Sequence, residues 1–162
     1  MNVIRKQKLM AVASAGGHWV QLHRLLPAWQ NREVVYVSTR ADVMMGIDER
    51  SSCASKTYTV TDANAKTVFR LLLLLAQITR IVFQERPPVI VSTGAAPGCL
   101  ALVLGKLLGA KTIWIDSIAN SERVSLSGRL ISPLADIWLT QWESVAASSF
   151  LGRNPQFVGT IL

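Results

Sequence analysis

Two kinds of segment alternate along the chain when its hydrophobic and polar positions are followed in order. Short runs rich in β-branched and other apolar residues are typical of strands buried in a parallel sheet. Between them, apolar residues recur at the spacing of one face of a helix. The strand-like runs are residues 8–13, 33–39, 56–60, 89–92, 111–115, 137–140 and 156–158. The helix-like segments are residues 19–29, 65–85, 99–108, 128–132 and 143–150.

This alternation predicts an α/β fold, with a Rossmann-like parallel sheet and helices on both faces. In such sheets, ligands bind beyond the carboxyl ends of the strands. We therefore expect a site to be built from the loops that follow the strands. Those loops are residues 14–18, 38–40, 92–98, 116–123 and 141–143. Residues 40–55 are irregular and polar, and we interpret them as a mobile loop.

The longest helix-like segment contains five consecutive leucines, Leu71 to Leu75. Because successive residues are about 100° apart around a helix, these leucines point in all directions. The predicted core stripe consists of Leu71, Leu75, Ile78 and Val82. The leucines between them are left to contact a neighbouring helix, a partner chain or lipid. Charged Arg70 and Arg80 interrupt the apolar run, which is therefore too short and too polar to span a bilayer.

Composition narrows the function classes. The chain has 162 residues, of which half are apolar and 17% charged, and its formal net charge is +7. These values predict one domain over residues 1–162 and exclude a disordered chain. The basic residues are dispersed, and no groove-reading motif accompanies them, so no nucleic-acid partner is expected. Basic residues beside an apolar helix instead favour anionic head groups at a membrane surface. Cys53 and Cys99 lack metal-ligand spacing, so we expect neither a metal site nor a disulfide.

The loop after the first strand, residues 14–18, is the sharpest chemical feature. Gly16 and Gly17 allow a tight turn and the close approach of a ligand. The helix that follows presents free N–H groups, which suit a phosphate or diphosphate. His18 is a candidate phosphate ligand or base, and a plain Gly-Gly turn capped by His18 is the alternative. The GxGxxG and GK[ST] fingerprints are absent, which argues against a free-standing nucleotide-binding module.

Two further loops bring polar groups to the same edge. Residues 92–98 form a second small-residue loop before a helix, which offers N–H groups and hydroxyls to a ligand or simply makes a tight turn. Asp116 follows the strand at residues 111–115. Its carboxylate has three possible roles: it orients a sugar hydroxyl, receives a proton or caps its own loop.

Several short motifs occur in the order found in a known family. They are Ala13-Ser14-Ala15-Gly16-Gly17-His18, Ser92-Thr93-Gly94, Trp114-Ile115-Asp116-Ser117-Ile118-Ala119, Ser125-Leu126-Ser127-Gly128-Arg129, Ala135-Asp136, Gln141-Trp142-Glu143 and Val158-Gly159-Thr160-Ile161-Leu162. With them, the chain resembles the acceptor-binding, membrane-associated half of bipartite glycosyltransferases, which are similar to glycosyltransferase family 28. That family includes the anchoring subunit of the enzyme that adds the second N-acetylglucosamine to dolichol diphosphate. Its bacterial relatives serve capsule and exopolysaccharide synthesis.

The resemblance implies that the chain is the N-terminal half of a GT-B fold divided between two proteins. A donor-binding glycosyltransferase subunit would hold the nucleotide-sugar, so no cofactor is expected here and the chain alone is expected to be inactive. The implied reaction is inverting transfer of a sugar to a lipid-diphosphate-linked saccharide in bacterial exopolysaccharide or capsule synthesis. His18 is the first candidate for the catalytic base, and Asp116 is the second. The expected location is cytoplasmic and peripheral, on the inner face of the plasma membrane.

Two sets of contact residues follow from the loops and the resemblance together. The acceptor and its diphosphate are expected to contact Ser14, Gly16, Gly17, His18, Ser92, Thr93, Gly94, Ser117 and Asn120. The membrane or the partner subunit is expected to contact Leu72, Leu73, Leu74, Trp142, Ile161 and Leu162. Two other hypotheses stay open: a non-catalytic membrane adaptor that recruits a catalytic partner, and a free-standing nucleotide-binding module.

Overall fold

A single parallel sheet organises the computed structural model, which describes residues 8–45, 47, 53–64 and 66–161. In this part of the chain, seven strands lie in the order β3-β2-β1-β4-β5-β6-β7, and all neighbouring pairs are parallel. The strands are β1 (Leu9–Ala13), β2 (Val34–Ser38), β3 (Ser55–Thr59), β4 (Val89–Gly94), β5 (Lys111–Ile115), β6 (Ile137–Thr140) and β7 (Gln156–Phe157). The N-terminal strands β1 to β3 and the C-terminal strands β4 to β7 are joined at the β1–β4 pair, where the strand order reverses.

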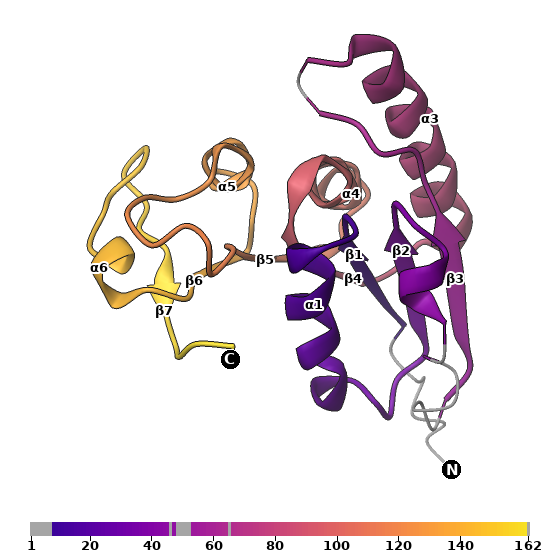
Figure 1. Cartoon of the computed structure of the whole chain (residues 1–162), viewed down its shortest axis with the longest axis horizontal. Coiled ribbons are helices and arrows are strands. Elements are labelled where there is room, and N and C mark those ends of the chain that lie inside the picture. The colour runs from indigo at the N-terminus through magenta and orange to yellow at the C-terminus, as the bar shows by residue number, and fades with distance from the viewer. Residues whose placement is uncertain (1–7, 46, 48–52, 65, 162) are drawn as a thin grey trace.

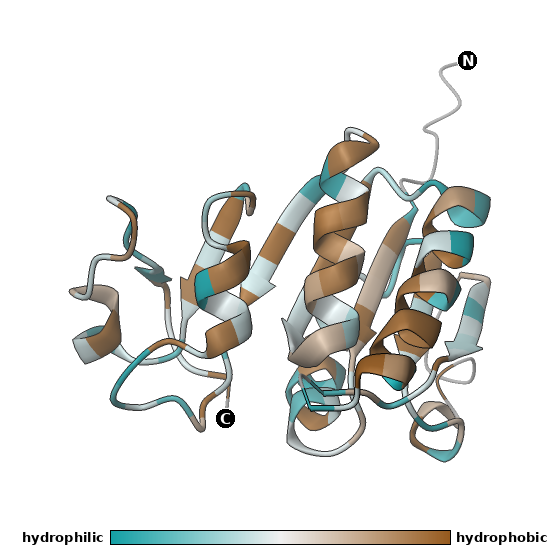
Figure 2. Cartoon of the chain, turned by 90° about the horizontal axis from the view of Figure 1, so that it is seen from above, coloured by the Kyte–Doolittle hydropathy of each residue, from teal (hydrophilic) through white to brown (hydrophobic). Residues whose placement is uncertain are grey.

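Helices cover both faces of this sheet (Figure 1). They are α1 (Gly17–Arg24), α3 (Val68–Glu85), α4 (Ala95–Leu107), α5 (Leu126–Ile131) and α6 (Glu143–Ala146), with 3₁₀ turns at Leu26–Ala28 and Asp42–Met44. The helices α3 and α4 pack against each other and run side by side, each carrying many hydrophobic residues (Figure 2). Since α1 follows β1 and α4 follows β4, both helices begin at the reversal point of the sheet.

The side chains of β1 alternate between two hydrophobic clusters, one on each face of the sheet. In β1, Met10 and Val12 belong to the cluster that includes Leu74 of α3 and Leu102 of α4. Leu9, Ala11 and Ala13 belong instead to a second cluster, with the apolar side chains of α1. Because successive side chains of a strand point to opposite faces, both faces of β1 are buried. This explains why the strands read as continuous apolar runs in the sequence.

The predicted strands agree with the structure to within one or two residues at each end. Two predicted helices end four or five residues earlier than expected. Helix α1 ends at Arg24, and the 3₁₀ turn that follows contains Pro27, whose ring removes a backbone donor. Helix α6 ends at Ala146, where the Ser148 hydroxyl bonds to the Val145 carbonyl and competes with further helical bonds. Of the loop expected to be mobile, residues 46 and 48–52 lie outside the described part, while Met44 is buried in the core.

The predicted core stripe of α3 is right at Ile78 and Val82, and Leu71 packs against the core, but the stripe is wrong at Leu75. Leu74, which we expected to contact the membrane or a partner, is fully buried, whereas Leu75 is 38% exposed. The buried face of α3 consists of Leu74, Ile78, Ile81, Val82 and Glu85. A run of five leucines looks alike from every side, so it does not fix the rotation of the helix. Residues further along the helix fix that rotation, including the buried carboxylate of Glu85.

Candidate acceptor site at the carboxyl edge of the sheet

The loop between β1 and α1 lies open at the reversal point. Gly16 has a φ of 92°, which L side chains rarely adopt, so glycine is required for the turn. A Cβ placed on Gly16 or Gly17 would meet nothing within 4 Å. The backbone here therefore faces open space, directly before the first turn of α1. The N–H groups of that first turn have no partners within the helix, and they carry its partial positive charge. A small anion can approach these groups closely.

His18 lies in the first turn of α1 and is half-buried. Its Nδ1 lies 2.9 Å from the backbone carbonyl oxygen of Thr93, at the end of β4. In return, the Thr93 hydroxyl donates a 2.7 Å hydrogen bond to the carbonyl oxygen of His18. Gly94 lies under the ring, and a Cβ at this position would be only 2.3 Å from Nδ1. The structure thus brings the loops after β1 and β4 together around the imidazole, as the sequence predicts.

Three other predicted acceptor contacts support the loop from inside. Ser92, Thr93 and Gly94 are all buried. The Ser92 hydroxyl accepts a 3.1 Å hydrogen bond from the Gly94 N–H, and it fits against Gly98, where a Cβ would be 1.8 Å away. The hydroxyls of Ser92 and Thr93 thus stabilise the turn, and direct contact of these three residues with the acceptor stays a prediction.

Asp116 is also buried, with 1% of its surface exposed. Its carboxylate accepts hydrogen bonds from the backbone N–H of Ser117 at 3.1 Å, the side chain of Asn120 at 3.1 Å and the N–H of Ser125 at 2.8 Å. Among the roles considered for Asp116, this geometry corresponds to capping its own loop. The catalytic role of Asp116 stays a prediction, and the hydrogen bonds of its carboxylate favour the capping role.

The remaining polar residues of this loop divide in the same way. Ser117 is buried, and its hydroxyl accepts hydrogen bonds from Gln21 of α1 at 3.2 Å and from the Ala119 N–H at 3.3 Å. Ser117 therefore supports the loop, and its contact with the acceptor stays a prediction. Asn120 is half-buried and lines a polar hollow formed by residues 119–123, so it stays a candidate contact together with half-buried Ser14.

Two buried amides, Gln21 and Gln141, link these loops. The sequence pattern did not point to Gln21. Gln141, after β6, donates from Nε2 to the Gln21 side chain and to the Asp116 carbonyl, both at 3.0 Å. Its Oε1 accepts a 3.0 Å hydrogen bond from the N–H of Ile161. Gln21 lies between the apolar residues of the helical face of α1, where a single polar residue gives little signal. The amides join the last described residues of the chain to the helix that carries His18.

The residues expected to contact a partner or the membrane are only partly accessible. Trp142 is 37% exposed, although its indole N–H donates a 2.7 Å hydrogen bond to the Ile118 carbonyl. Ile161 is half-buried and packs against the core cluster of α1, and Leu162 lies outside the described residues. Leu72 and Leu73 are exposed on α3.

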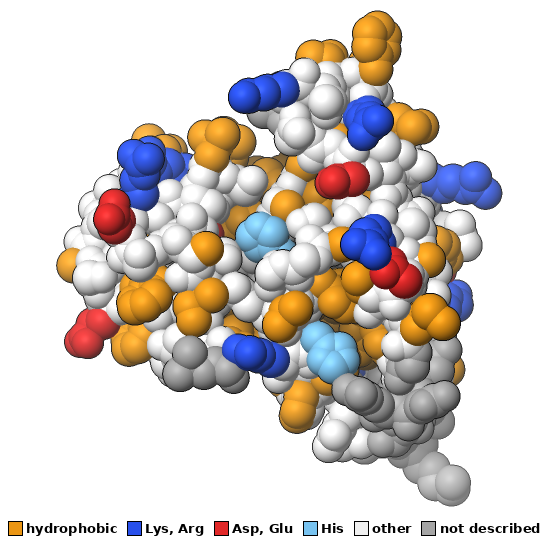
Figure 3. Space-filling view, viewed as in Figure 1, with side chains coloured by type: hydrophobic (Ala, Val, Ile, Leu, Met, Phe, Trp, Pro, Cys, Tyr) orange, Lys and Arg blue, Asp and Glu red, His pale blue; other side chains and the backbone are white. Residues whose placement is uncertain are grey.

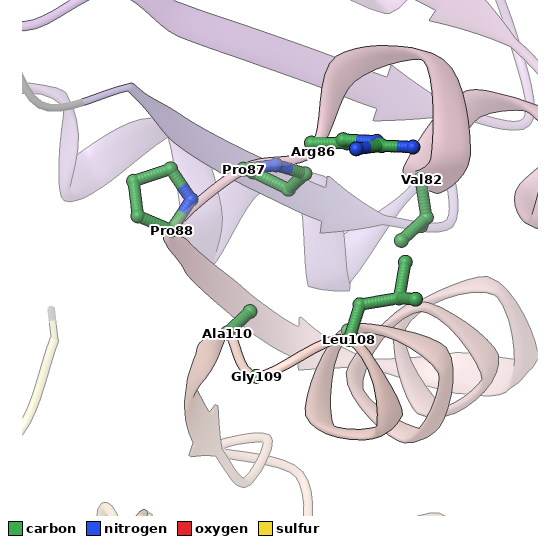
Figure 4. A pocket seen from close by; sticks show the side chains of 8 residues that line it. Val82, Arg86, Pro87, Pro88, Leu108, Gly109 and Ala110 are labelled. Carbon is green, nitrogen blue, oxygen red and sulfur yellow. The ribbon is translucent and has the colours of Figure 1, made fainter.

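A separate hollow lies at the opposite end of the strands, where β4 and β5 begin (Figure 4). It is lined by residues at the end of α3 and before β4 and β5, among them Arg86, Pro88 and Ala110. None of the predicted site residues lines it. Within the described ranges, no three His, Cys, Asp or Glu side chains are grouped to hold a metal ion. No helix of the described chain is long and apolar enough to cross a membrane.

Sequence comparisons identify related proteins over nearly the whole chain. Residues 9–161 match the family model described as "Oligosaccharide biosynthesis protein Alg14 like". A relative from Candida albicans, named UDP-N-acetylglucosamine transferase subunit ALG14, is 30% identical over 164 residues, which cover 89% of this chain and 74% of that protein. The protein of the same name from Homo sapiens is 26% identical over 186 residues, covering 94% and 86% of the two chains.

Solved structures show the same fold at low sequence identity. MurG from Acinetobacter baumannii superimposes with a TM-score of 0.69 at 14% identity, covering 95% of this chain and 45% of that one. A UDP-N-acetylglucosamine 2-epimerase from Rickettsia bellii gives a TM-score of 0.68 at 12% identity, covering 97% and 46%. The chain thus spans less than half the length of these structures. The expected family and the expected fold, a Rossmann-like sheet matching the N-terminal half of a GT-B enzyme, are confirmed.

Proposed function

This chain belongs to the Alg14 family, and we propose that it is the acceptor-binding subunit of a two-chain UDP-N-acetylglucosamine transferase. The curated relatives carry the name of a subunit of such a transferase. The observation that carries the acceptor role is the open Gly16-Gly17 turn at the reversal point of the sheet, directly before α1. In this proposal, residues 1–162 form one acceptor-side domain, and the partner subunit holds the nucleotide-sugar.

The proposed acceptor is a lipid carrying a diphosphate-linked saccharide. A diphosphate suits the site because the first-turn N–H groups of α1 and its helix dipole favour negative charge. Gly16 and Gly17 leave room for the phosphate oxygens beside the backbone. His18 and Ser14 stand next to this turn, so they are placed to meet the first sugar or the diphosphate.

The proposed chemistry is an inverting displacement with His18 as the base. The acceptor hydroxyl attacks the anomeric carbon of the donor, and its proton passes to the imidazole. The new glycosidic bond forms as the bond to the nucleoside diphosphate breaks, and the leaving group departs with the electron pair of that bond. Asp116, Ser92 and Thr93 hold the surrounding loops and take no part in the proton transfer.

The cellular setting is a finer part of the proposal. The relatives compared above come from a fungus and a mammal. We propose bacterial exopolysaccharide or capsule synthesis as the alternative setting, in which the acceptor is a lipid diphosphate at the cytoplasmic face of the plasma membrane. Both settings require the same chemistry at the Gly16-Gly17 turn, because both acceptors are lipid diphosphates.

Replacement of His18 tests the proposed function. In the reconstituted pair of subunits, His18→Ala is expected to lower transfer at least about 100-fold, because a general base typically contributes that much. Copurification with the partner subunit should be unchanged. The matched control is His23→Ala, on the same helix, which should retain the wild-type rate.

Two results would contradict this proposal. A wild-type transfer rate in His18→Ala would favour the non-catalytic adaptor instead. Robust transfer by the isolated wild-type chain would contradict the division of the enzyme between two subunits.

We also propose that the start of α3 contacts the membrane surface. Phe69 is 89% exposed, and Leu72 and Leu73 are exposed beside it. Basic Lys66 and Arg70 are exposed at the same end of the helix, and Figure 3 shows basic and hydrophobic side chains together over this end of α3. Since α3 follows β3, it begins at the carboxyl ends of the strands, as the acceptor turn does. A lipid acceptor would meet both features from one side.

Vesicle binding tests this contact. The double variant Phe69→Ser with Leu72→Ser is expected to bind vesicles of anionic lipid at least about tenfold more weakly. The reason is that two large apolar side chains are no longer available to move from water into the lipid. Cosedimentation measures the bound fraction. The control is Leu107→Ser, which changes a side chain that is 77% exposed at the far end of α4. Equal binding of the double variant and the wild type would contradict the contact.

A further inference from the structure

The hydrogen bond between His18 and Thr93 fixes where the imidazole carries its hydrogen. A carbonyl oxygen can only accept a hydrogen bond, and Nδ1 of His18 lies 2.9 Å from the carbonyl oxygen of Thr93. Nδ1 must therefore carry the hydrogen, in the neutral ring as well as in the protonated one. A neutral imidazole has only one N–H, so its Nε2 is left with a free lone pair.

The surroundings hold the ring in this orientation. Thr93 is fully buried at the end of a central strand, and its hydroxyl ties the backbone of His18 to the same residue. The ring fills the space that a Cβ of Gly94 would occupy, and Gly94 has a φ of 143°. The contact is thus made by two backbone elements rather than by flexible side chains, which favours a single ring position.

Nε2 has no competing partner within the described residues: the hydrogen bond of Nδ1 to Thr93 is the only one of the imidazole ring found there. We infer that Thr93 and Gly94 are positioning residues that hold His18 as the Nδ1–H tautomer, so that Nε2 is the atom that accepts the acceptor's proton. The inference rests on the proposed base role of His18, and it names the atom and the groups that prepare it. When the proton arrives at Nε2, the positive ring keeps its hydrogen bond to the Thr93 carbonyl, which stabilises the charge.

Nitrogen NMR of the full chain tests the tautomer directly. The chain contains two histidines, so ¹⁵N-histidine labelling gives two ring systems, and the spectrum of His18→Asn assigns them. At a pH where the ring is neutral, His18 is expected to show a protonated Nδ1 and an unprotonated Nε2. A ring with its hydrogen on Nε2, or one that exchanges freely between the two tautomers, would overturn the inference.

Gly94→Ala tests the positioning groups. The added methyl group must displace the ring, so the His18 signals are expected to move toward an exchanging tautomer mixture, and transfer by the reconstituted pair to fall at least tenfold. The control is Gly109→Ala, which also changes a glycine with positive φ but has open space around it. This control should keep the wild-type tautomer and rate. Wild-type signals and rate in a folded Gly94→Ala would overturn the inference, and if that variant does not fold, the wild-type spectrum alone decides.

The base role and the tautomer can fail separately. In His18→Asn, the side-chain amide reaches the position of Nδ1 and can still donate to the Thr93 carbonyl, but no proton acceptor replaces Nε2. Transfer is expected to fall at least about 100-fold. A wild-type rate in His18→Asn would remove the base role from the proposed function, whatever tautomer the wild-type ring shows.

Discussion

The buried carboxylate of Glu85 joins α3 to β3 and to the residue before β1. Its side chain is 1% exposed and accepts hydrogen bonds from Lys8, from Lys56 at 3.1 Å and from the Tyr58 hydroxyl at 2.6 Å. Burial by itself would raise the pKa of Glu85, but the hydrogen bonds from Lys8, Tyr58 and Lys56 outweigh it and hold the pKa at about 2. The same hydroxyl contact raises the pKa of Tyr58. Glu85 thus fastens the end of α3 to β3 and to the start of β1.

The lowered pKa predicts how this carboxylate contributes to stability. Because the folded-state pKa of Glu85 lies below the unfolded value of 4.5, its contribution is complete above about pH 4.5 and is lost as the pH falls toward 2. The shift corresponds to about 3 kcal/mol of unfolding free energy at neutral pH. Glu85→Gln should therefore be clearly less stable than the wild type at pH 7, and the difference should shrink between pH 4.5 and 2.

Denaturant unfolding across this pH range measures the effect. Glu33→Gln is the matched control, because Glu33 also faces Lys8 but is 38% exposed at its side chain, 3.6 Å away. That control should change stability little at any pH. A difference between Glu85→Gln and the wild type that stays constant with pH would contradict the assigned role.

Individual site residues could be predicted from the sequence only as members of loops. The Gly16-Gly17-His18 turn was accessible to prediction because a glycine pair directly after a strand marks a tight turn. Ser92 and Asp116 carry the same polar signal whether they face a ligand or their own loop. Their direction depends on where each strand ends, and the register between β1 and β4 shifts at Ala13, which no local pattern reveals.

At the scale of elements, α3 separates what periodicity determines from what it does not. The helix itself is predicted by its length and by the prolines that follow Arg86. Its rotation depends on residues far away in the sequence, among them Lys8 and Tyr58, which contact the buried Glu85 and lie outside any local window. The leucine run therefore predicted correctly that one side of the helix is buried and another exposed. It placed Leu75 on the buried side and Leu74 on the exposed side, whereas the structure has the reverse.

Alanine substitutions in the leucine run test this rotation. Leu74→Ala should lower the free energy of unfolding by about 2–5 kcal/mol, because it removes a buried side chain and leaves a cavity. Leu75→Ala should lower it much less, since Leu75 is 38% exposed. Urea unfolding measures both values. Equal losses, or a larger loss at Leu75, would contradict the rotation of α3 in this structure.

At the scale of the whole molecule, the sheet order explains why the candidate site has one location. The chain builds β1 to β3 on one side and then returns to place β4 on the other side of β1. Two adjacent loops then diverge, and α1 and α4 leave the sheet on opposite faces. The alternation of strands and helices predicts this class of sheet, but the order of strands comes from long-range packing. The chain spans less than half the length of its structural neighbours.

The buried amides at positions 21 and 141 carry an evolutionary consequence. Each amide has its direction fixed, because Gln141 accepts from the backbone of Ile161 while it donates to Gln21, which in turn donates to Ser117. A change at one of these glutamines leaves a buried donor or acceptor without its counterpart, at a cost of about 1–3 kcal/mol. Substitutions at these two positions should therefore be inherited together across related sequences, although 120 residues separate them along the chain.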